Sequence, residues 1–163
     1  MGVFEDALLD VLPRLRRFAR ALTRDAADAD DLTQAAIEKA LKARQQWQPG
    51  TRMDSWMYRI MRNAWIDTAR ARKRAAETFL PEEASANVAD SGASAIEAHV
   101  EFGELSAAMH DLPDEQREAV ALVLIEGLAY KEAAEILEIP MGTLTSRLVR
   151  GRQALIARLG EAA

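Results

Sequence analysis

The chain has 163 residues, 49% hydrophobic and 29% charged, which is enough apolar material for one ordinary domain or two small ones. It contains no cysteine, which excludes a disulfide framework, a thiolate metal site and a cysteine nucleophile. Two histidines offer little for a zinc site, and no apolar run approaches the roughly 20 residues that span a bilayer. The first residues also lack the basic start and apolar core of a signal peptide. We therefore expect a cytoplasmic protein with no metal, no cofactor and no membrane insertion.

The net charge is −5, but the basic groups concentrate in two segments. Residues 39–74 carry ten basic and two acidic side chains, and residues 141–159 carry four arginines and no acid. A polyanion responds to local patches rather than to net charge, so both segments are candidate nucleic-acid surfaces.

Apolar residues recur three and four positions apart along most of the chain, and no segment shows strand alternation, so we predict an all-α fold. Two small helical domains are expected, over residues 1–76 and 96–163. Between them, residues 77–95 are rich in Ala, Ser, Glu and Asp and show little apolar period, which is typical of a flexible linker.

Three helices are predicted in the first domain. Pro13 interrupts the first apolar pattern, so the first turns are expected to be separate or the helix to start near this residue. Asp28 is the expected N-cap of the second helix. Thr51 and Asp54 resemble a capping box that opens a third helix running to about Arg74.

The third helix carries the first basic segment on one side. Its predicted exposed arc contains Arg59, Arg62, Asn63, Arg70 and Lys73. Tyr58 and Trp65 are expected beside this arc and away from the core, and Trp47 precedes the helix in a loop. Basic groups with adjacent aromatic rings suit single-stranded nucleic acid, because charges meet the backbone and rings stack on bases. Alternatively, Trp47 and Trp65 pack against the first two helices.

The second helix differs in character, because its first half is acidic and polar. This pattern complements the helix dipole without any function, or it forms a docking face for a protein partner. In the third helix, Asp67 is interpreted as a structural ion-pair partner of Arg70 or Arg74.

The second domain is predicted to contain a helix-turn-helix. A helix that ends before Leu112 is followed by a helix over 114–126, with Gly127 as its C′ residue. A short helix over 131–137, a tight turn and a final helix over 141–159 then form the motif.

The final helix has one face without any acidic residue. The exposed positions predicted from the helical period are Thr145, Ser146, Val149, Arg150 and Gln153. Hydroxyls, a forked cationic donor and an apolar group are what the major groove requires. Arg147 and Arg152 flank this face and are expected to contact phosphate, whereas Arg158 is expected to be structural. The alternative is a solvated helix in a small bundle.

Two groups of short strings resemble a known family. The first is ADDLTQ at 29–34, WQPGT at 47–51, SWMYRI at 55–60 and NAWID at 63–67. The second is LP at 112–113, EGLAYKEAA at 126–134 and IPMGTLTSRL at 139–148. Together they resemble regions 2 and 4 of the extracytoplasmic-function (group 4) sigma factors of bacterial RNA polymerase, within the sigma-70 family. The strings QPGT at 48–51 and RNAWID at 62–67 resemble the corresponding strings in relatives of the general stress sigma factor.

The resemblance implies two DNA-reading modules. Region 4 would read the −35 element as duplex, with contacts from Thr143, Thr145, Ser146, Arg147, Val149, Arg150, Arg152 and Gln153. Region 2 would hold the melted −10 element, with contacts from Trp47, Gln48, Thr51, Arg59, Arg62, Asn63, Arg70 and Lys73. Ala129 departs from the family pattern, because a Ser or Thr commonly caps the helix there, at a cost of about 1 kcal/mol.

The resemblance also implies protein partners. The β′ clamp helices of the polymerase core would bind the face around Asp30, Asp31, Leu32 and Gln34, and the β flap would be a further contact. An anti-sigma factor is expected to hold the protein inactive.

Three classes of function are weighed. The leading hypothesis is a dissociable sigma factor that has no catalytic activity of its own. The rival is a sigma-like decoy that sequesters an anti-sigma factor without binding DNA. A decoy needs neither the acid-free face nor the basic arc, and we expect no receiver domain beside the two modules. An enzyme is disfavoured because the chain has no Gly-rich phosphate loop, Ser-His-acid set or HExxH motif.

Overall fold

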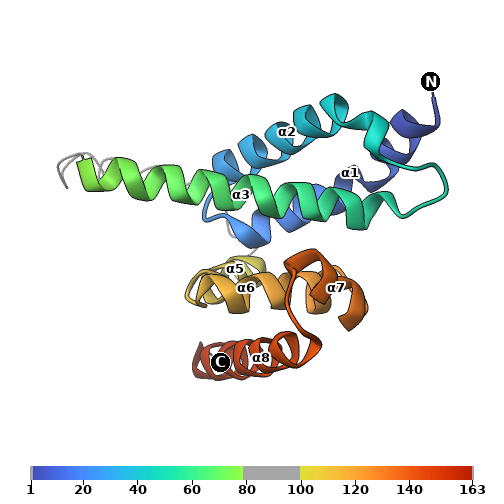
Figure 1. Cartoon of the computed structure of the whole chain (residues 1–163). Helices are drawn as coiled ribbons and strands as arrows, with labels where there is room; N and C mark the ends of the chain where they lie inside the picture. The colour runs from blue at the N-terminus through green and yellow to red at the C-terminus, as the bar shows by residue number, and fades with distance from the viewer. Residues whose placement is uncertain (1, 79–99, 163) are drawn as a thin grey trace.

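The computed structural model describes residues 2–78 and 100–162 and is all-α over these ranges, as predicted (Figure 1). The N-terminal domain contains α1 (Val3–Leu22), α2 (Ala26–Lys42), a 3-10 turn η1 (Arg44–Gln46) and α3 (Met53–Thr78). The C-terminal domain contains α5 (Val100–His110), α6 (Asp114–Val120), a π turn η5 (Ala121–Ile125), α7 (Tyr130–Leu137) and α8 (Met141–Ala162). Most of the expected linker, residues 79–95, lies outside the described residues.

Helix α1 is continuous through Pro13, so the expected interruption is wrong. Proline removes one hydrogen bond to the carbonyl four residues earlier, that of Leu9. Both Pro13 and Leu9 lie on the exposed side of α1, where water reaches the carbonyl, while Leu15 and Phe18 on the other side are fully buried. The buried face therefore maintains the helix across the proline.

The N-terminal ends of α2 and α3 also differ from the expected caps. Asp25, not Asp28, caps α2, because its carboxylate accepts a hydrogen bond from the Asp28 backbone N–H at 2.7 Å. At α3, the Thr51 hydroxyl donates to the Gln48 carbonyl at 2.6 Å, and Asp54 accepts from the adjacent Ser55 N–H. The predicted capping box is therefore absent. Helix α3 also extends two residues into the expected linker, to Thr78.

In the C-terminal domain, α6 continues into the π turn and ends where the sequence predicted. The Glu126 N–H bonds the Ala121 carbonyl at 2.9 Å, and Gly127 follows with a φ of 75°, the left-handed conformation that favours glycine. This π turn places the Glu126 side chain toward the N-terminal domain, where it meets Arg17 and Tyr58.

The two domains pack against each other. Helices α1 and α3 contact α5, α6, η5 and α7. Helix α8 lies beyond these elements, on the side of the C-terminal domain away from α1 to α3 (Figure 1). The domain packing therefore leaves α8 open and covers one side of α3.

Candidate nucleic-acid interface

The outer face of α8 is open, as the helical period predicted. Leu144, Leu148 and Gly151 are buried and fix the rotation of the helix against the domain. The exposed residues on the other side are Thr145, Ser146, Val149, Arg150, Arg152 and Gln153. Thr143 is half-buried. Six of the eight residues predicted to contact duplex DNA therefore lie together at the surface.

The turn before α8 sets its direction. Glu138 adopts the left-handed conformation, with a φ of 57°, and ends α7 directly before Pro140 and the start of α8. Helix α7 begins after Ala129, which provides no side-chain cap, in line with the departure noted in the sequence. The buried Ile136 and Leu137 hold α7 in place despite this missing cap.

Two arginines of α8 have partners within the C-terminal domain. Arg147 lies 3.8 Å from the Glu115 carboxylate and is half-buried. Arg158 pairs with Asp111, as expected for a structural residue. Arg150 and Arg152 are in none of the ion pairs found among the described residues, and both are exposed.

The basic arc of α3 is divided by the packing of the domains. Asn63, Arg70 and Lys73 are exposed. Arg59 is also exposed but donates a hydrogen bond to the backbone carbonyl of Glu135 at 3.0 Å, and the half-buried Arg62 pairs with Glu118 at 3.3 Å. Both of those partners belong to the C-terminal domain.

The aromatic residues near the arc are not displayed for stacking. Tyr58 is fully buried, so its expected position away from the core is wrong, because its ring packs edge-on against Phe18 of α1, with centroids 5.0 Å apart, and its hydroxyl bonds Glu126 of the C-terminal domain. Trp47 is buried and packs edge-on against Phe4 of α1, with ring centroids 5.8 Å apart. Trp65 is half-buried against the core. The packing alternative therefore describes both tryptophans, and in this arrangement Trp47 offers no free ring to a base. Gln48 and Thr51 of the same loop are exposed.

On α2, the acidic face is present with one correction. Asp30, Asp31 and Gln34 are exposed, but Leu32 is only 5% exposed and belongs to the core. Its side chain packs inward in this arrangement, and its expected contact with the polymerase stays a prediction. Asp28 instead pairs with Arg72 through two hydrogen bonds of 2.9 and 2.6 Å, and the Arg72 guanidinium lowers the pKa of Asp28.

Asp67 forms an ion pair, as predicted, but with another partner and at an exposed position where such a pair contributes little to stability. Its carboxylate lies 3.7 Å from Lys39 of α2 rather than beside Arg70 or Arg74. The pair therefore connects α2 and α3, whereas the predicted pair would have formed within α3.

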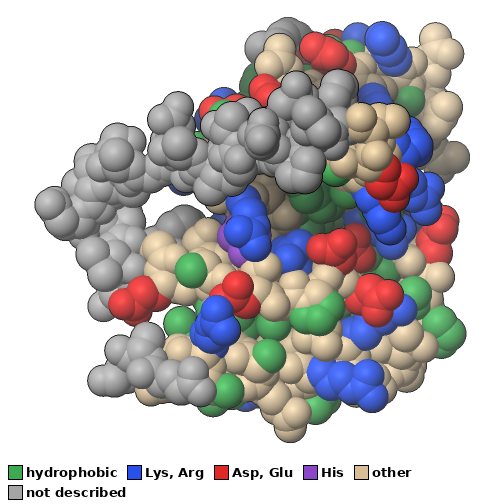
Figure 2. Space-filling model, turned by 90° about the vertical axis from the view of Figure 1, so that its left-hand side faces the viewer, with side chains coloured by type: hydrophobic (Ala, Val, Ile, Leu, Met, Phe, Trp, Pro, Cys, Tyr) green, Lys and Arg blue, Asp and Glu red, His purple; other side chains and the backbone are tan. Residues whose placement is uncertain are grey.

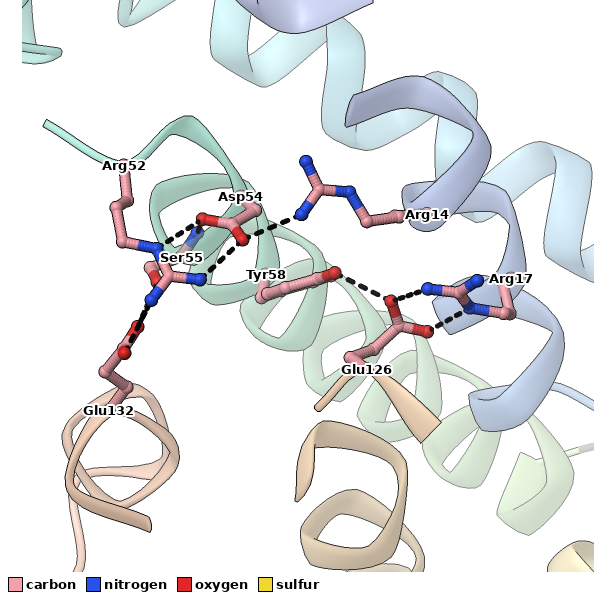
Figure 3. A network of polar contacts seen from close by, with 8 residues as sticks. All are labelled: Arg14, Arg17, Arg52, Asp54, Ser55, Tyr58, Glu126 and Glu132. Carbon is pink, nitrogen blue, oxygen red and sulfur yellow. Dashed lines mark hydrogen bonds and ion pairs between the residues drawn. The ribbon is translucent and has the colours of Figure 1, made fainter. Parts of the chain in front are cut away.

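Polar contacts between the domains were not predicted. Figure 3 shows Glu126 between Arg17 and Tyr58, and Glu132 beside Arg52 and Ser55. Acidic and basic side chains also lie side by side along the boundary in Figure 2. The helical period predicts which face of a helix each residue occupies. It does not predict which residue of another helix, 68 to 109 positions away, will be the partner.

Asp54 extends this network within the N-terminal domain. It accepts hydrogen bonds from Arg14 at 3.0 Å and from Arg52 at 2.8 and 3.1 Å. Burial disfavours the charged form of Asp54, but the bonds from Arg52 and the Ser55 N–H outweigh burial and lower the pKa. Asp54 therefore remains a carboxylate that orients both arginines.

Other classes of site are not found in residues 2–78 and 100–162. No group of His, Cys, Asp and Glu side chains there could hold a metal ion. None of the helices in these ranges is long and apolar enough to cross a membrane.

Two family models match the chain. Residues 8–62 match the Sigma2 domain of PhyR, and residues 102–155 match Sigma-70, region 4. The ECF RNA polymerase sigma factor EcfG of Rhodopseudomonas palustris is 38% identical over 154 residues, which cover 94% of this chain and 83% of that relative. The chain belongs to the ECF RNA polymerase sigma factors. The resemblance inferred from the sequence is confirmed, and α8 is the second helix of the region 4 helix-turn-helix.

Further relatives agree with this assignment. SigE of Mycolicibacterium smegmatis is 39% identical over 144 residues, which cover 87% of this sigma factor and 56% of that protein. The sigma factor RpoE from Bartonella quintana, solved in complex with the anti-sigma factor NepR, matches with a TM-score of 0.83 and 30% identity. The match covers 96% of both chains, so the helices of both domains correspond.

Proposed function

We propose that this sigma factor directs RNA polymerase to promoters by reading the −35 element with α8 and holding the melted −10 element with α3. The observation that carries the proposal is the open, acid-free face of α8 on the side away from the N-terminal domain. That face can meet a duplex without any change in the packing of the domains.

The chemistry of α8 suits the major groove. Arg150 offers two parallel donors, which match the O6 and N7 acceptors of guanine. Val149 is 48% exposed and offers an apolar group for a thymine methyl. Arg152 at the edge of the face, and Arg147 once it leaves Glu115, would meet phosphates and fix the register.

The exposed part of α3 suits a single strand. Arg70 and Lys73 provide charge for phosphates, while Asn63 and the polar loop residues Gln48 and Thr51 provide hydrogen bonds. Because Trp47 is buried, binding in this arrangement relies on charge and hydrogen bonds rather than on stacking.

Protein partners are proposed for other surfaces. The exposed Asp30, Asp31 and Gln34 of α2 would bind the β′ clamp helices, and the C-terminal domain would bind the β flap. Since RpoE from Bartonella quintana was solved with an anti-sigma factor, we propose that an anti-sigma factor also binds this chain. The protein would act in the cytoplasm, where the polymerase transcribes.

Genome-wide run-off transcription with core polymerase tests the proposal. The wild-type chain should yield transcripts that share −35 and −10 elements, and Arg150→Glu should abolish them. Arg16→Glu makes the same charge change on exposed α1 and should leave transcription intact. If no genomic fragment yields a transcript while an anti-sigma factor still binds, the chain is the decoy and the proposal is wrong.

A further inference from the structure

Three glutamates of the C-terminal domain reach across the boundary to arginines of the N-terminal domain. Glu118 in α6 pairs with Arg62, Glu126 after η5 pairs with Arg17, and Glu132 in α7 pairs with Arg52. The glutamates come from three different elements, so they define a surface rather than a single contact. We call Glu118, Glu126 and Glu132 the carboxylate row.

Glu126, drawn in Figure 3, is the most deeply buried carboxylate of the three. Its side chain is completely buried and accepts two hydrogen bonds from Arg17, each 2.8 Å, and one from the Tyr58 hydroxyl at 2.7 Å. A carboxylate that is buried without such partners is strongly destabilising, so the closed arrangement of the domains depends on the donors that Arg17 and Tyr58 provide to Glu126.

Glu132 meets an arginine that is already oriented. Arg52 is held by Asp54 on one side and donates to Glu132 at 2.5 Å, while the Ser55 hydroxyl donates to the same carboxylate at 3.1 Å. Because Asp54 is fixed by Arg14 as well, little conformational freedom is lost when Arg52 meets Glu132.

The third contact engages residues proposed for DNA. Arg62 donates to Glu118 at 3.3 Å, and Arg59 donates to the Glu135 carbonyl at 3.0 Å. Both arginines belong to the arc proposed to hold the melted −10 strand. Arg62 donates its Nε–H to Glu118, and the negative charge of this carboxylate repels a phosphate that approaches the same guanidinium, so the pairing with Glu118 weakens the attraction of Arg62 for DNA.

We propose that the carboxylate row is a latch that closes the two domains and competes with single-stranded DNA for the arginines of α3. The inference rests on the proposed function for the identity of the competing ligand. In the closed state, duplex binding by α8 remains open while part of the single-strand surface is occupied. Opening of the latch, by DNA itself or by a protein that separates the domains, releases Arg59 from the Glu135 carbonyl and Arg62 from Glu118.

The distance between the domains tests the latch without any DNA. Since the natural chain has no cysteine, two cysteines placed at the exposed Lys42 and Ala157 take a donor and an acceptor dye without competing labels. The variant with Glu118→Gln, Glu126→Gln and Glu132→Gln should show lower energy transfer than the wild type. The control variant with Asp10→Asn, Glu104→Gln and Glu138→Gln makes the same charge change at exposed positions and should keep wild-type transfer.

The competition is measured with a random-sequence single strand of about 12 nucleotides. If the open state is about a tenth of the wild-type population, the latch variant should bind this strand about tenfold more tightly, because apparent affinity scales with the competent fraction. The control variant reports how much of any gain comes from charge alone. Unchanged energy transfer overturns the proposal, and so does lower energy transfer with no gain in affinity beyond the control.

A charge exchange separates the latch from a loss of folding. Glu118→Arg alone should open the domains, and adding Arg62→Glu should restore energy transfer without restoring tight strand binding. If the exchange fails to close the domains, the pairing of these two residues is not the cause of closure. Failure of the proposed function has another signature, since a wild-type chain that never supports transcription would leave the energy-transfer results unaffected.

Discussion

Tyr58 in α3 donates its hydroxyl proton to Glu126, and the 2.7 Å bond joins two domains through residues 68 positions apart. Neither side chain is exposed to solvent. Burial, together with the neighbouring carboxylate, raises the pKa of Tyr58 well above its ordinary value, so the hydroxyl remains a donor throughout the working pH range. The contact between the domains is therefore a specific buried bond and not only a set of surface ion pairs.

Replacing Tyr58 with Phe tests this bond. The ring can remain against Phe18, whose centroid lies 5.0 Å away, but the Glu126 carboxylate loses one of its three donors. We expect a loss of about 1.5–3 kcal/mol in the free energy of unfolding, the range for hydrogen bonds to charged groups. Urea denaturation of the full chain measures it. Tyr130→Phe removes an exposed hydroxyl as the control, and equal losses in the two variants would contradict a special role for Tyr58.

Gly151 shows that close packing of α6 against α8 positions the proposed recognition face. A Cβ added there would lie 2.8 Å from a Val120 methyl and 3.4 Å from the Gln116 Cβ. Gly151→Ala should therefore destabilise the chain by about 1–3 kcal/mol through overpacking. In the same helix, Gly142→Ala meets no atom within 4 Å and should stabilise by up to about 1 kcal/mol through helix propensity. Thermal unfolding of both variants gives the sign of each change.

The sequence predicted correctly the features that depend on the residue pattern of a single helix. The outer face of α8 follows from its own period, because Leu144, Leu148 and Gly151 are buried on the opposite side. The assignment to two small helical domains follows from the same local patterns. Their boundary stays a prediction, since it falls on residues outside the described ranges.

The residues whose burial differs from the expectation pack against other elements of the fold. The buried stripe predicted for α3 placed Tyr58 away from the core, whereas its ring packs against the fully buried Phe18 of α1 and its hydroxyl bonds Glu126 of the other domain. Leu32 and Trp47 each stand in a string with exposed polar residues, yet both side chains are buried against neighbouring helices. Their hydrophobicity explains this burial, and the binding roles that the family resemblance implies for them stay predictions.

Arg117 joins α5 to α6 and offers a third test. It is almost fully buried and donates to the carbonyls of Met109, His110 and Leu112, at 3.0, 3.1 and 2.7 Å. These carbonyls end α5 or follow it, so the guanidinium satisfies acceptors that the helix leaves open. Lysine lacks the planar fork, and Arg117→Lys should cost about 2–4 kcal/mol in the free energy of unfolding. The exposed Arg150→Lys change should cost little, and comparable unfolding midpoints would refute the capping role.

His110 makes stability depend on pH in a known direction. Burial, with Arg117 and Arg24 nearby, lowers the pKa of His110 to about 4. The unfolded chain binds a proton near the ordinary histidine pKa of about 6.5, whereas the folded chain stays neutral there. Stability conferred by the neutral ring is therefore present above about pH 6.5 and decreases as the pH falls toward about 4.

The variant His110→Gln isolates this contribution, because the wild type and the variant share every other titratable group. Between pH 7 and 5 the wild type should lose about 1 kcal/mol more than the variant, an amount reduced because the ring is partly exposed to solvent. Urea denaturation at several pH values measures both curves. Parallel curves over this interval would show that another group carries the pH dependence.

Arg150 and Arg152 should separate base reading from phosphate binding. Arg150 lies on the same outer face as Val149, whereas Arg152 lies at its edge, and both are exposed. In polymerase holoenzyme, Arg150→Ala should reduce the discrimination between a cognate and a mutated −35 element by about 1–3 kcal/mol. Arg152→Ala should weaken binding to both elements equally and lower the slope of affinity against salt by about 1. Promoter binding measured over a salt series distinguishes the two effects. The opposite assignment, with Arg152 setting base preference, would mean that α8 enters the groove rotated toward Arg152, and Val149 would then no longer be placed to meet a thymine methyl.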